Sequence, residues 1–124
     1  MSGYMKGGKI SDIYSDILFE LKKVDGVKML AVAERNGFLI SEPVSDEKEM
    51  LTRMSASMLK AAETLTNKLK KVGRRVIVDY DGGKIITMNA GQKALISVMA
   101  SQDASLDPII TELERTAGKI KKIL

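Results

Sequence analysis

The segment from Val27 to Glu34 is apolar at almost every position. In an extended strand successive side chains point to opposite faces, so Met29 and Ala31 lie on one face, and Leu30 and Val32 on the other. A strand that is apolar on both faces is stable only where both faces are covered. This segment therefore requires a layered fold in which a sheet lies between helices.

Glycine-containing turns divide the rest of the chain into further strands. Asn36-Gly37 favours a type I′ hairpin because both residues accept a positive φ, and it predicts a second strand over 38–41. Three more strands are predicted over 75–80, 84–90 and 94–100, separated by turns at 81–83 and 91–93. These three form consecutive antiparallel hairpins. The predicted turn residues are Gly26, Asn36, Gly37, Gly73, Gly82 and Gly83.

Three amphipathic helices are predicted around these strands. The first begins at Ser11 as N-cap, with apolar residues at helical spacing up to Val24. The second is capped by Ser45 or Asp46 and runs to residue 72, with Gly73 as the residue just past its end. The third is capped by Asp107 and has a proline in its first turn, where a missing N–H costs nothing.

The predicted order is helix, strand, strand, helix, strand, strand, strand, helix. Short turns between strands favour an antiparallel sheet. Helices on both faces then give a three-layer sandwich of the α+β type. We expect a flexible tail over residues 1–9 and a single domain over 10–124, because no repeat or linker divides the chain.

Composition excludes several classes of function. The chain has no His and no Cys, so zinc sites and the Ser-His and Cys-His nucleophile pairs cannot be built. No apolar run approaches the roughly 20 residues that span a bilayer. A hydrophobic content of 44% with 29% charged residues fits a soluble globular protein. We expect a cytoplasmic protein without a metal or a cofactor.

The small positive charge leaves a nucleic-acid-binding function open as the alternative. The formal charge is +4, from 20 basic and 16 acidic residues. A basic group at the end of the second predicted helix and just beyond it consists of Lys68, Lys70, Lys71, Arg74 and Arg75. The aromatic content of 4% argues against stacking on single-stranded nucleic acid. Much of the excess lies at the two ends of the chain, in Lys6, Lys9, Lys119, Lys121 and Lys122, and solvated ends are the simpler interpretation of these charges.

The second predicted helix is apolar over a wider arc than one sheet contact requires. Met50, Met54 and Met58 follow one another at four-residue spacing, and Met suits adaptable interfaces. The sharper hypothesis is that this side packs against a second chain. The simpler hypothesis is that the helix is well buried within one chain and that its Met side chains fill the core. The predicted interface residues on the helix are Met50, Met54, Met58, Ala61 and Leu65.

The strand predicted over 75–80 begins the three-strand meander and so can lie at a sheet edge. Its middle residues, Val76, Ile77 and Val78, include no Pro and no charge that would deter pairing. If the same edge of a second copy pairs with it around a two-fold axis, two sheets join and two copies of the second helix come together. We therefore predict that these three residues belong to the same interface.

The start of the chain partly matches a phosphate-binding loop. Gly3, Gly8 and Lys9 have the loop's glycines and lysine. Ile10 stands where Ser or Thr would hold magnesium, and no strand precedes the glycines. The match therefore fails.

Two other positions suggest chemistry only weakly. Asp79 and Asp81 could be an acidic pair or a partial metal site, but Asp and Gly are ordinary turn residues. Arg35 could act as an arginine finger in phosphoryl transfer. A solvated charge at the end of a hairpin is the simpler interpretation.

Several segments together resemble a known family. Residues 24–27 (Val-Asp-Gly-Val), the strand 30–35 (Leu-Ala-Val-Ala-Glu-Arg) and the hairpin arm 36–41 (Asn-Gly-Phe-Leu-Ile-Ser) look like the opening of a roadblock-type dynein light chain domain. The second helix and the meander follow in the family's order. The resemblance covers about residues 10–124 and consists of pattern more than of invariant chemistry. Longin and profilin folds share this layered design.

The resemblance implies both an architecture and a function. It implies a five-stranded antiparallel sheet with the second helix on one face and the other two helices on the opposite face. It also implies a homodimer, or a heterodimer with a related subunit, that binds a small Ras-like GTPase or a motor complex. Some members stimulate GTP hydrolysis and others only anchor a GTPase. We therefore expect a non-enzymatic adapter or regulator, and no catalytic residue is carried over from the family.

Overall fold

The computed structural model describes residues 9–41 and 43–124. Its elements, in chain order, are α1 (Lys9–Lys22), β1 (Val27–Glu34), α2 (Asp46–Lys68), β2 (Val76–Tyr80), β3 (Gly83–Asn89), β4 (Ala94–Ser101) and α3 (Leu106–Ile123). Residues 1–8 of the predicted tail, with the glycines of the partial phosphate-loop match, lie outside the described residues, and Lys9 begins α1. The last three strands agree with their predicted positions to within one residue at each end.

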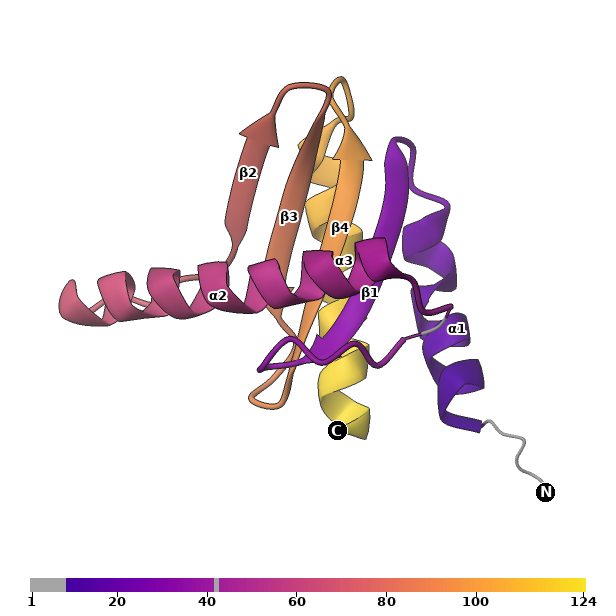
Figure 1. Ribbon diagram of the computed structural model, residues 1–124, viewed down its shortest axis with the longest axis horizontal. Helices are drawn as coiled ribbons and strands as arrows, with labels where there is room; N and C mark the ends of the chain where they lie inside the picture. The colour runs from indigo at the N-terminus through magenta and orange to yellow at the C-terminus, as the bar shows by residue number, and fades with distance from the viewer. Residues whose placement is uncertain (1–8, 42) are drawn as a thin grey trace.

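The described strands form one antiparallel sheet in the order β1-β4-β3-β2. Figure 1 shows α2 crossing one face of this sheet while α1 and α3 cover the other. The three-layer sandwich is therefore confirmed. It follows from the strands themselves, because β4 is buried on both faces over most of its length.

The main core lies between the sheet and the two helices α1 and α3. Helix residues such as Leu18 and Leu113 meet strand residues such as Val32 and Ile96, and all four are fully buried. Burying one side chain of this size contributes about 1.5–3 kcal/mol. The opposite face has a smaller apolar cluster, made of Ala33, Leu59 and Leu95. The α2 layer is therefore held by fewer apolar contacts than the other two helices.

The five-stranded sheet is wrong, because the described residues contain four strands. The segment 38–41 forms only an isolated bridge between Leu39 and Ala33. The backbone N–H groups of Ile40 and Ser41 both donate to the Val32 carbonyl, and the Val32 N–H donates to the Ser41 side chain at 2.9 Å. A serine hydroxyl thus replaces a backbone acceptor, so the regular ladder ends there.

The predicted type I′ turn is also wrong. Gly37 has φ of +95°, whereas Asn36 does not have the positive φ that type I′ requires at both central positions. The Gly37 N–H donates to the Glu34 carbonyl, and the Glu34 N–H donates to that of Phe38. The loop is therefore a three-residue hairpin with glycine in the left-handed position. The Asn36 side chain accepts from the Phe38 N–H at 3.0 Å and supports the turn.

Helix α2 ends earlier than predicted. Its last residue is Lys68, and the left-handed residue beyond it is Lys70, with φ of +58°, in place of Gly73. The N–H groups of Lys70 and Lys71 donate to the carbonyls of Asn67 and Thr66, which would otherwise lack partners at the helix end. At the other end, Ser45 is the N-cap, and its side chain accepts from the Lys48 N–H at 3.2 Å.

The beginnings of the other helices differ from the prediction as well. Helix α1 begins at Lys9, so Ser11 lies inside it and is not its N-cap. Helix α3 has Ser105 as its N-cap in place of Asp107. Pro108 is then the third helical residue, where its missing N–H is still one of the first four that have no acceptor within the helix.

Glycines occupy the tight turns on either side of β1 and β3. Gly26 and Gly82 have φ of +91° and +96°, a region that residues with side chains rarely adopt. Gly83 instead begins β3, where an added Cβ would lie 2.6 Å from the Tyr80 hydroxyl and 2.9 Å from the Ala100 carbonyl. Its role is to allow close packing.

Candidate protein-interaction site

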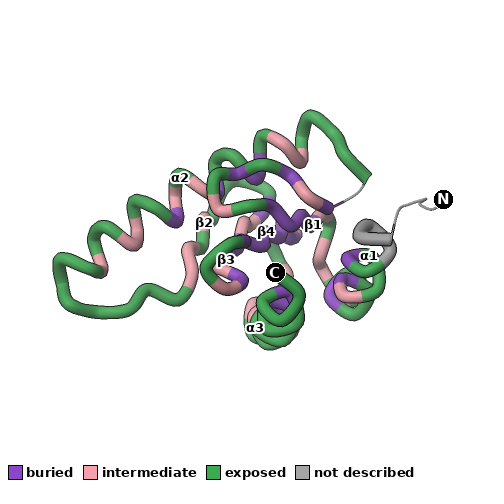
Figure 2. The backbone as a smooth tube through the Cα atoms, turned by 90° about the horizontal axis from the view of Figure 1, so that it is seen from below, coloured by how far each residue is buried: buried purple, intermediate pink, exposed green. Residues whose placement is uncertain are grey.

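Helix α2 is too long for the sheet that it crosses. Its 23 residues span about 34 Å at 1.5 Å per residue. Four strands spaced about 4.8 Å apart place the outer strands only about 14 Å from each other. Figures 1 and 2 both show the C-terminal half of α2 extending past β2 with no strand beneath it. An amphipathic helix that overhangs its own sheet leaves part of its apolar side uncovered.

The predicted interface residues on α2 lie largely on this uncovered side. The side chains of Met50, Met54 and Leu65 are 61%, 56% and 60% exposed, respectively. Ala61 is exposed and Met58 is half-buried. The residues that face the sheet are Leu51, Thr52, Ser55 and Leu59, all of them buried. The wide apolar arc thus divides into a buried part and an exposed part, and Met50 and Met54 do not fill the core.

The three predicted strand residues lie at a free edge. Strand β2 is the last strand of the sheet, and no described strand pairs with its outer edge. Val76 is half-buried and packs near the small cluster beneath α2, and Val78 is half-buried as well. Ile77, which points to the opposite face, is 42% exposed. The structure therefore brings the β2 edge and the overhanging part of α2 to the same side of the molecule (Figure 1).

Part of the sheet face that carries α2 also remains only partly covered, and sequence reasoning missed it. Strand register places apolar side chains on this face beyond the reach of α2, and each of them is half-buried or exposed. They are Met29, Val78, Tyr80, Ile85 and Met99. Their alternation was visible in the sequence, but their exposure depends on where α2 crosses the sheet, which local patterns do not specify.

Arg35 is held in an ion pair. Its Nη2 lies 2.6 Å from Glu63 Oε1 in α2, and Glu63 Oε2 accepts from Asn89 Nδ2 in β3 at 2.7 Å. The Arg35 side chain is only 30% exposed. This arrangement joins the first hairpin, α2 and β3. A guanidinium held in this way does not project toward a partner, so the geometry supports a structural role.

Asp79 and Asp81 do not form a site. Asp79 lies opposite Lys84 in the β2–β3 hairpin, and Asp81 lies in the turn itself. Both residues are exposed. Within residues 9–41 and 43–124, no group of three or more acidic side chains is arranged to hold a metal ion.

The basic group after α2 is not one continuous surface. Arg75 Nη2 lies 2.8 Å from Glu114 Oε2 in α3, so this cation is used to hold β2 against α3. Lys70 is the left-handed residue that ends α2, and Lys68 and Lys71 are exposed beside it. One of the five basic residues is therefore engaged in an ion pair within the chain.

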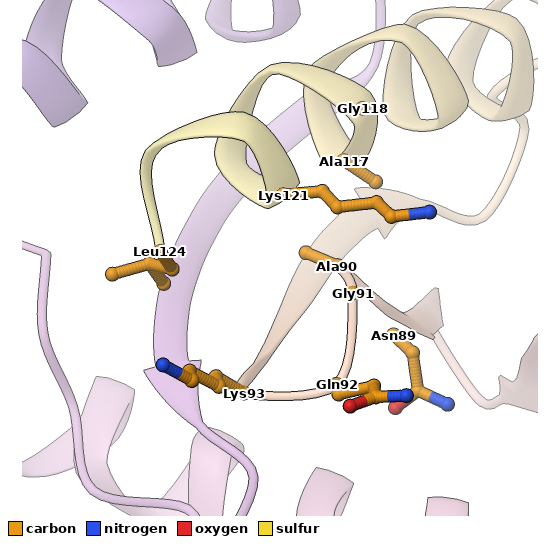
Figure 3. A pocket seen from close by; sticks show the side chains of 9 residues that line it. All are labelled: Asn89, Ala90, Gly91, Gln92, Lys93, Ala117, Gly118, Lys121 and Leu124. Atoms are coloured by element: carbon orange, nitrogen blue, oxygen red, sulfur yellow. The ribbon is translucent and has the colours of Figure 1, made fainter.

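A cavity of about 610 Å³ lies at the end of the sheet where β3 turns into β4. It separates the β3–β4 turn from the last turns of α3, and Figure 3 shows the Lys121 side chain extending over Gly91. Its lining includes two lysines and two amides, Lys93, Lys121, Asn89 and Gln92. No Asp or Glu side chain is among its lining residues.

Comparison with known proteins identifies the family. The model of the Roadblock/LC7 domain matches residues 13–100. The chain belongs to the Roadblock/LC7 family. The match includes the first hairpin, α2 and all of the meander except Ser101. These elements carry the exposed side of α2, the β2 edge and the partly covered sheet face.

Individual relatives agree with this assignment. An uncharacterized protein of Methanocaldococcus jannaschii is 26% identical over 115 residues, which are 90% of this chain and 97% of the relative. The structure of MglB in a tetrameric arrangement superposes with a TM-score of 0.83 at 18% identity, covering 94% of this chain and 91% of that one. MglB from Thermus thermophilus gives 0.82 at 17% identity, covering 94% and 92%.

The expected relation to profilin is also found. Profilin II of Acanthamoeba castellanii superposes with a TM-score of 0.59 at 13% identity, covering 86% of this chain and 96% of that one. At these identities the structural matches show the fold alone. None of the helices in the described part of the chain is long and apolar enough to cross a membrane.

Proposed function

We propose that this Roadblock/LC7 protein is a non-enzymatic, dimeric adapter or regulator that binds a small Ras-like GTPase. Membership in the family supports the GTPase as partner. The observation that carries the dimer is the overhang of the C-terminal half of α2 beyond β2, with the exposed side chain of Leu65 on the overhanging part. Met54, which is also exposed, lies on the same apolar side of the helix nearer its start.

A second copy fits the exposed surface because the surface complements itself. If two β2 edges pair antiparallel around a two-fold axis, the two sheets become one continuous sheet. Each overhanging α2 then extends across the axis over its partner's sheet. On that sheet it covers the half-buried side chains that the α2 of the same chain as the sheet does not reach, including Ile85 and Met99. The helix length, the free edge and the uncovered sheet face then have a single explanation.

The tetrameric MglB shows that a protein of this fold can assemble from several chains. A related roadblock subunit has the same free strand edge and long helix as an identical copy. The partner in the dimer is therefore either an identical chain or a related subunit. The GTPase is either anchored or stimulated in its hydrolysis of GTP. This chain contributes a docking surface in both cases, and we assign no catalytic residue to it.

Size-exclusion chromatography with light scattering tests the dimer. We expect the wild-type chain to be a dimer and Met54→Glu to be a monomer, because a charge in an apolar interface is costly to bury. Lys60→Glu is the matched control, since Lys60 is an exposed residue of the same helix outside the apolar arc. A wild-type monomer, or a Met54→Glu variant of unchanged mass, would contradict this interface.

The GTPase is tested by adding small GTPases from the same genome, in their GDP and GTP forms, to the same chromatography. We expect one of them to co-elute with the wild-type dimer. The rate of GTP hydrolysis with and without the dimer then distinguishes a stimulator from an anchor. Absence of co-elution with every GTPase would remove this part of the proposal while leaving the dimer in place.

A further inference from the structure

The sheet has a second outer edge, which belongs to β1. The segment 38–41 covers only the half that contains Val32 and Glu34, whose backbone groups bond to it. Toward the beginning of the strand, a cavity of about 270 Å³ lies against β1 between the end of α1 and the start of α2. Leu30 lies two residues before Val32, so its backbone N–H and carbonyl face the same edge.

Lysines from three different elements line this cavity. Lys22 comes from the last turn of α1, Lys28 from β1 and Lys48 from the first turn of α2. Lys48 Nζ donates to the Pro43 carbonyl at 3.1 Å, so its ammonium group is held beside this edge. Lys22 and Lys28 are exposed, whereas Lys48 is half-buried. Three positive charges thus gather on one strand edge, although the chain as a whole is nearly balanced.

These charges repel one another. Burial and the nearby Lys22 ammonium lower the pKa of Lys48 below its ordinary value. The charged form of an ammonium group that neighbouring cations disfavour is stabilised when an anion binds beside it. The cavity is therefore better suited to a negatively charged occupant than to water alone.

The same charges decide which kind of chain can occupy the edge. A second copy of β1 would bring three more lysines to the same place, and like charges opposite each other are destabilising. Lysines at a strand edge commonly prevent this kind of pairing. An extended segment that carries carboxylates meets no such repulsion, and its backbone can bond to the strand while its side chains contact the ammonium groups.

We propose that the edge of β1 near Lys22, Lys28 and Lys48 is a docking site for an extended acidic segment of a partner protein, which adds to the sheet as a further strand. This site lies at the opposite edge of the sheet from β2. It does not use the β2 edge, through which the two copies of the proposed dimer pair.

Fluorescence anisotropy with a labelled peptide tests the site. The probe is a fluorescein-labelled peptide of roughly eight residues in which Glu alternates with Val, and the matched probe has Gln in place of every Glu. We expect the Glu probe to bind the full chain and the Gln probe to bind at least about tenfold more weakly. The triple variant K22E/K28E/K48E should lose binding of the Glu probe to a similar extent.

A control variant separates a site from general attraction to a basic protein. K60E/K119E/K121E changes the net charge by the same amount at exposed residues that do not line this cavity. We expect it to bind the Glu probe about as well as the wild type does. Equal losses in the two triple variants would show non-specific attraction and overturn the proposal.

A third probe tests strand addition. N-methylation of alternate backbone amides in the Glu peptide keeps its charge but removes half of its backbone donors. We expect this probe to bind at least about tenfold more weakly than its parent. Equal binding of the two Glu probes would show that the lysines attract acids without strand pairing. If neither Glu probe binds, the lysines only deter edge pairing. Either result overturns the proposal. The molar mass of each variant, measured in parallel, reports separately on the dimer.

Discussion

The Ser97 hydroxyl in β4 lies 2.7 Å from the Ser55 hydroxyl in α2, and both side chains are fully buried. Ser97 Oγ also lies 2.8 Å from Thr87 Oγ1 in β3. A chain of three hydroxyls thus joins α2 to the two central strands. Because the apolar cluster on this face is small, these hydrogen bonds contribute to fixing where α2 crosses the sheet, together with those of Thr52 to Gly37 and of Asn89 to Glu63.

We predict that Ser97→Ala destabilises the fold by roughly 1–3 kcal/mol, because it removes the partner of the buried Ser55 hydroxyl, whereas the Thr87 hydroxyl still donates to the Ile96 carbonyl. Replacing the whole set with Ser55→Ala, Thr87→Val and Ser97→Ala should cost less than the sum of the single changes, since no orphaned hydroxyl then remains. Urea unfolding at one fixed protein concentration measures this. Additive costs would show that the three hydroxyls act independently.

Gly26 connects α1 to β1 where no side chain fits. An added Cβ would lie 2.5 Å from the Ala104 Cβ, and the residue has φ of +91°. We predict that Gly26→Ala destabilises the protein by more than about 2 kcal/mol, through both backbone strain and the clash with Ala104. Thermal and urea unfolding measure the change.

Gly82 provides the matched control for this prediction. Its φ of +96° is nearly the same, but an added Cβ would meet nothing within 4 Å. Gly82→Ala should therefore cost only about 1 kcal/mol, from backbone strain alone. If the two variants unfold alike, the contact with Ala104 is not important and the left-handed backbone accounts for both effects.

The strands of the meander could be predicted closely because their signals are local. Side-chain alternation and the glycine turns lie within a few residues of each other, and pairing between neighbours in sequence needs no further information. The replacement of the predicted strand over 38–41 by an isolated bridge could not be predicted in the same way. It depends on a hydroxyl competing with a backbone carbonyl for the Val32 N–H, and the sequence pattern of 38–41 is the same for either outcome.

The site could be predicted only in part. The sequence shows that α2 has more apolar surface than one sheet needs, which led to Met50 and Met54. It does not show the width of the sheet or the point at which α2 crosses it, so the half-buried Ile85 and Met99 were missed. Ion pairs between residues far apart in the sequence could not be predicted either. Arg35 and Glu63 are 28 residues apart, and no local pattern links them.

The Arg35–Glu63 pair separates a structural role from a catalytic one. We predict that Arg35→Ala costs at most about 1 kcal/mol of stability, because both side chains are about one-third exposed and solvent screens the pair. If the dimer stimulates a GTPase, we expect Arg35→Ala to leave the rate of GTP hydrolysis unchanged. An arginine finger would instead lose roughly 10³-fold or more.

Glu63→Gln is the informative partner variant, because it breaks the same ion pair while leaving the Arg35 guanidinium in place. The Gln amide oxygen can still accept from Asn89, which holds the other side of the bridge. A structural Arg35 predicts that both variants lose similar stability and that neither changes hydrolysis. A catalytic Arg35 predicts a split, in which Arg35→Ala abolishes stimulation and Glu63→Gln, by releasing the guanidinium, preserves or raises it. Single-turnover GTP hydrolysis, measured beside urea unfolding of the same preparations, decides between them.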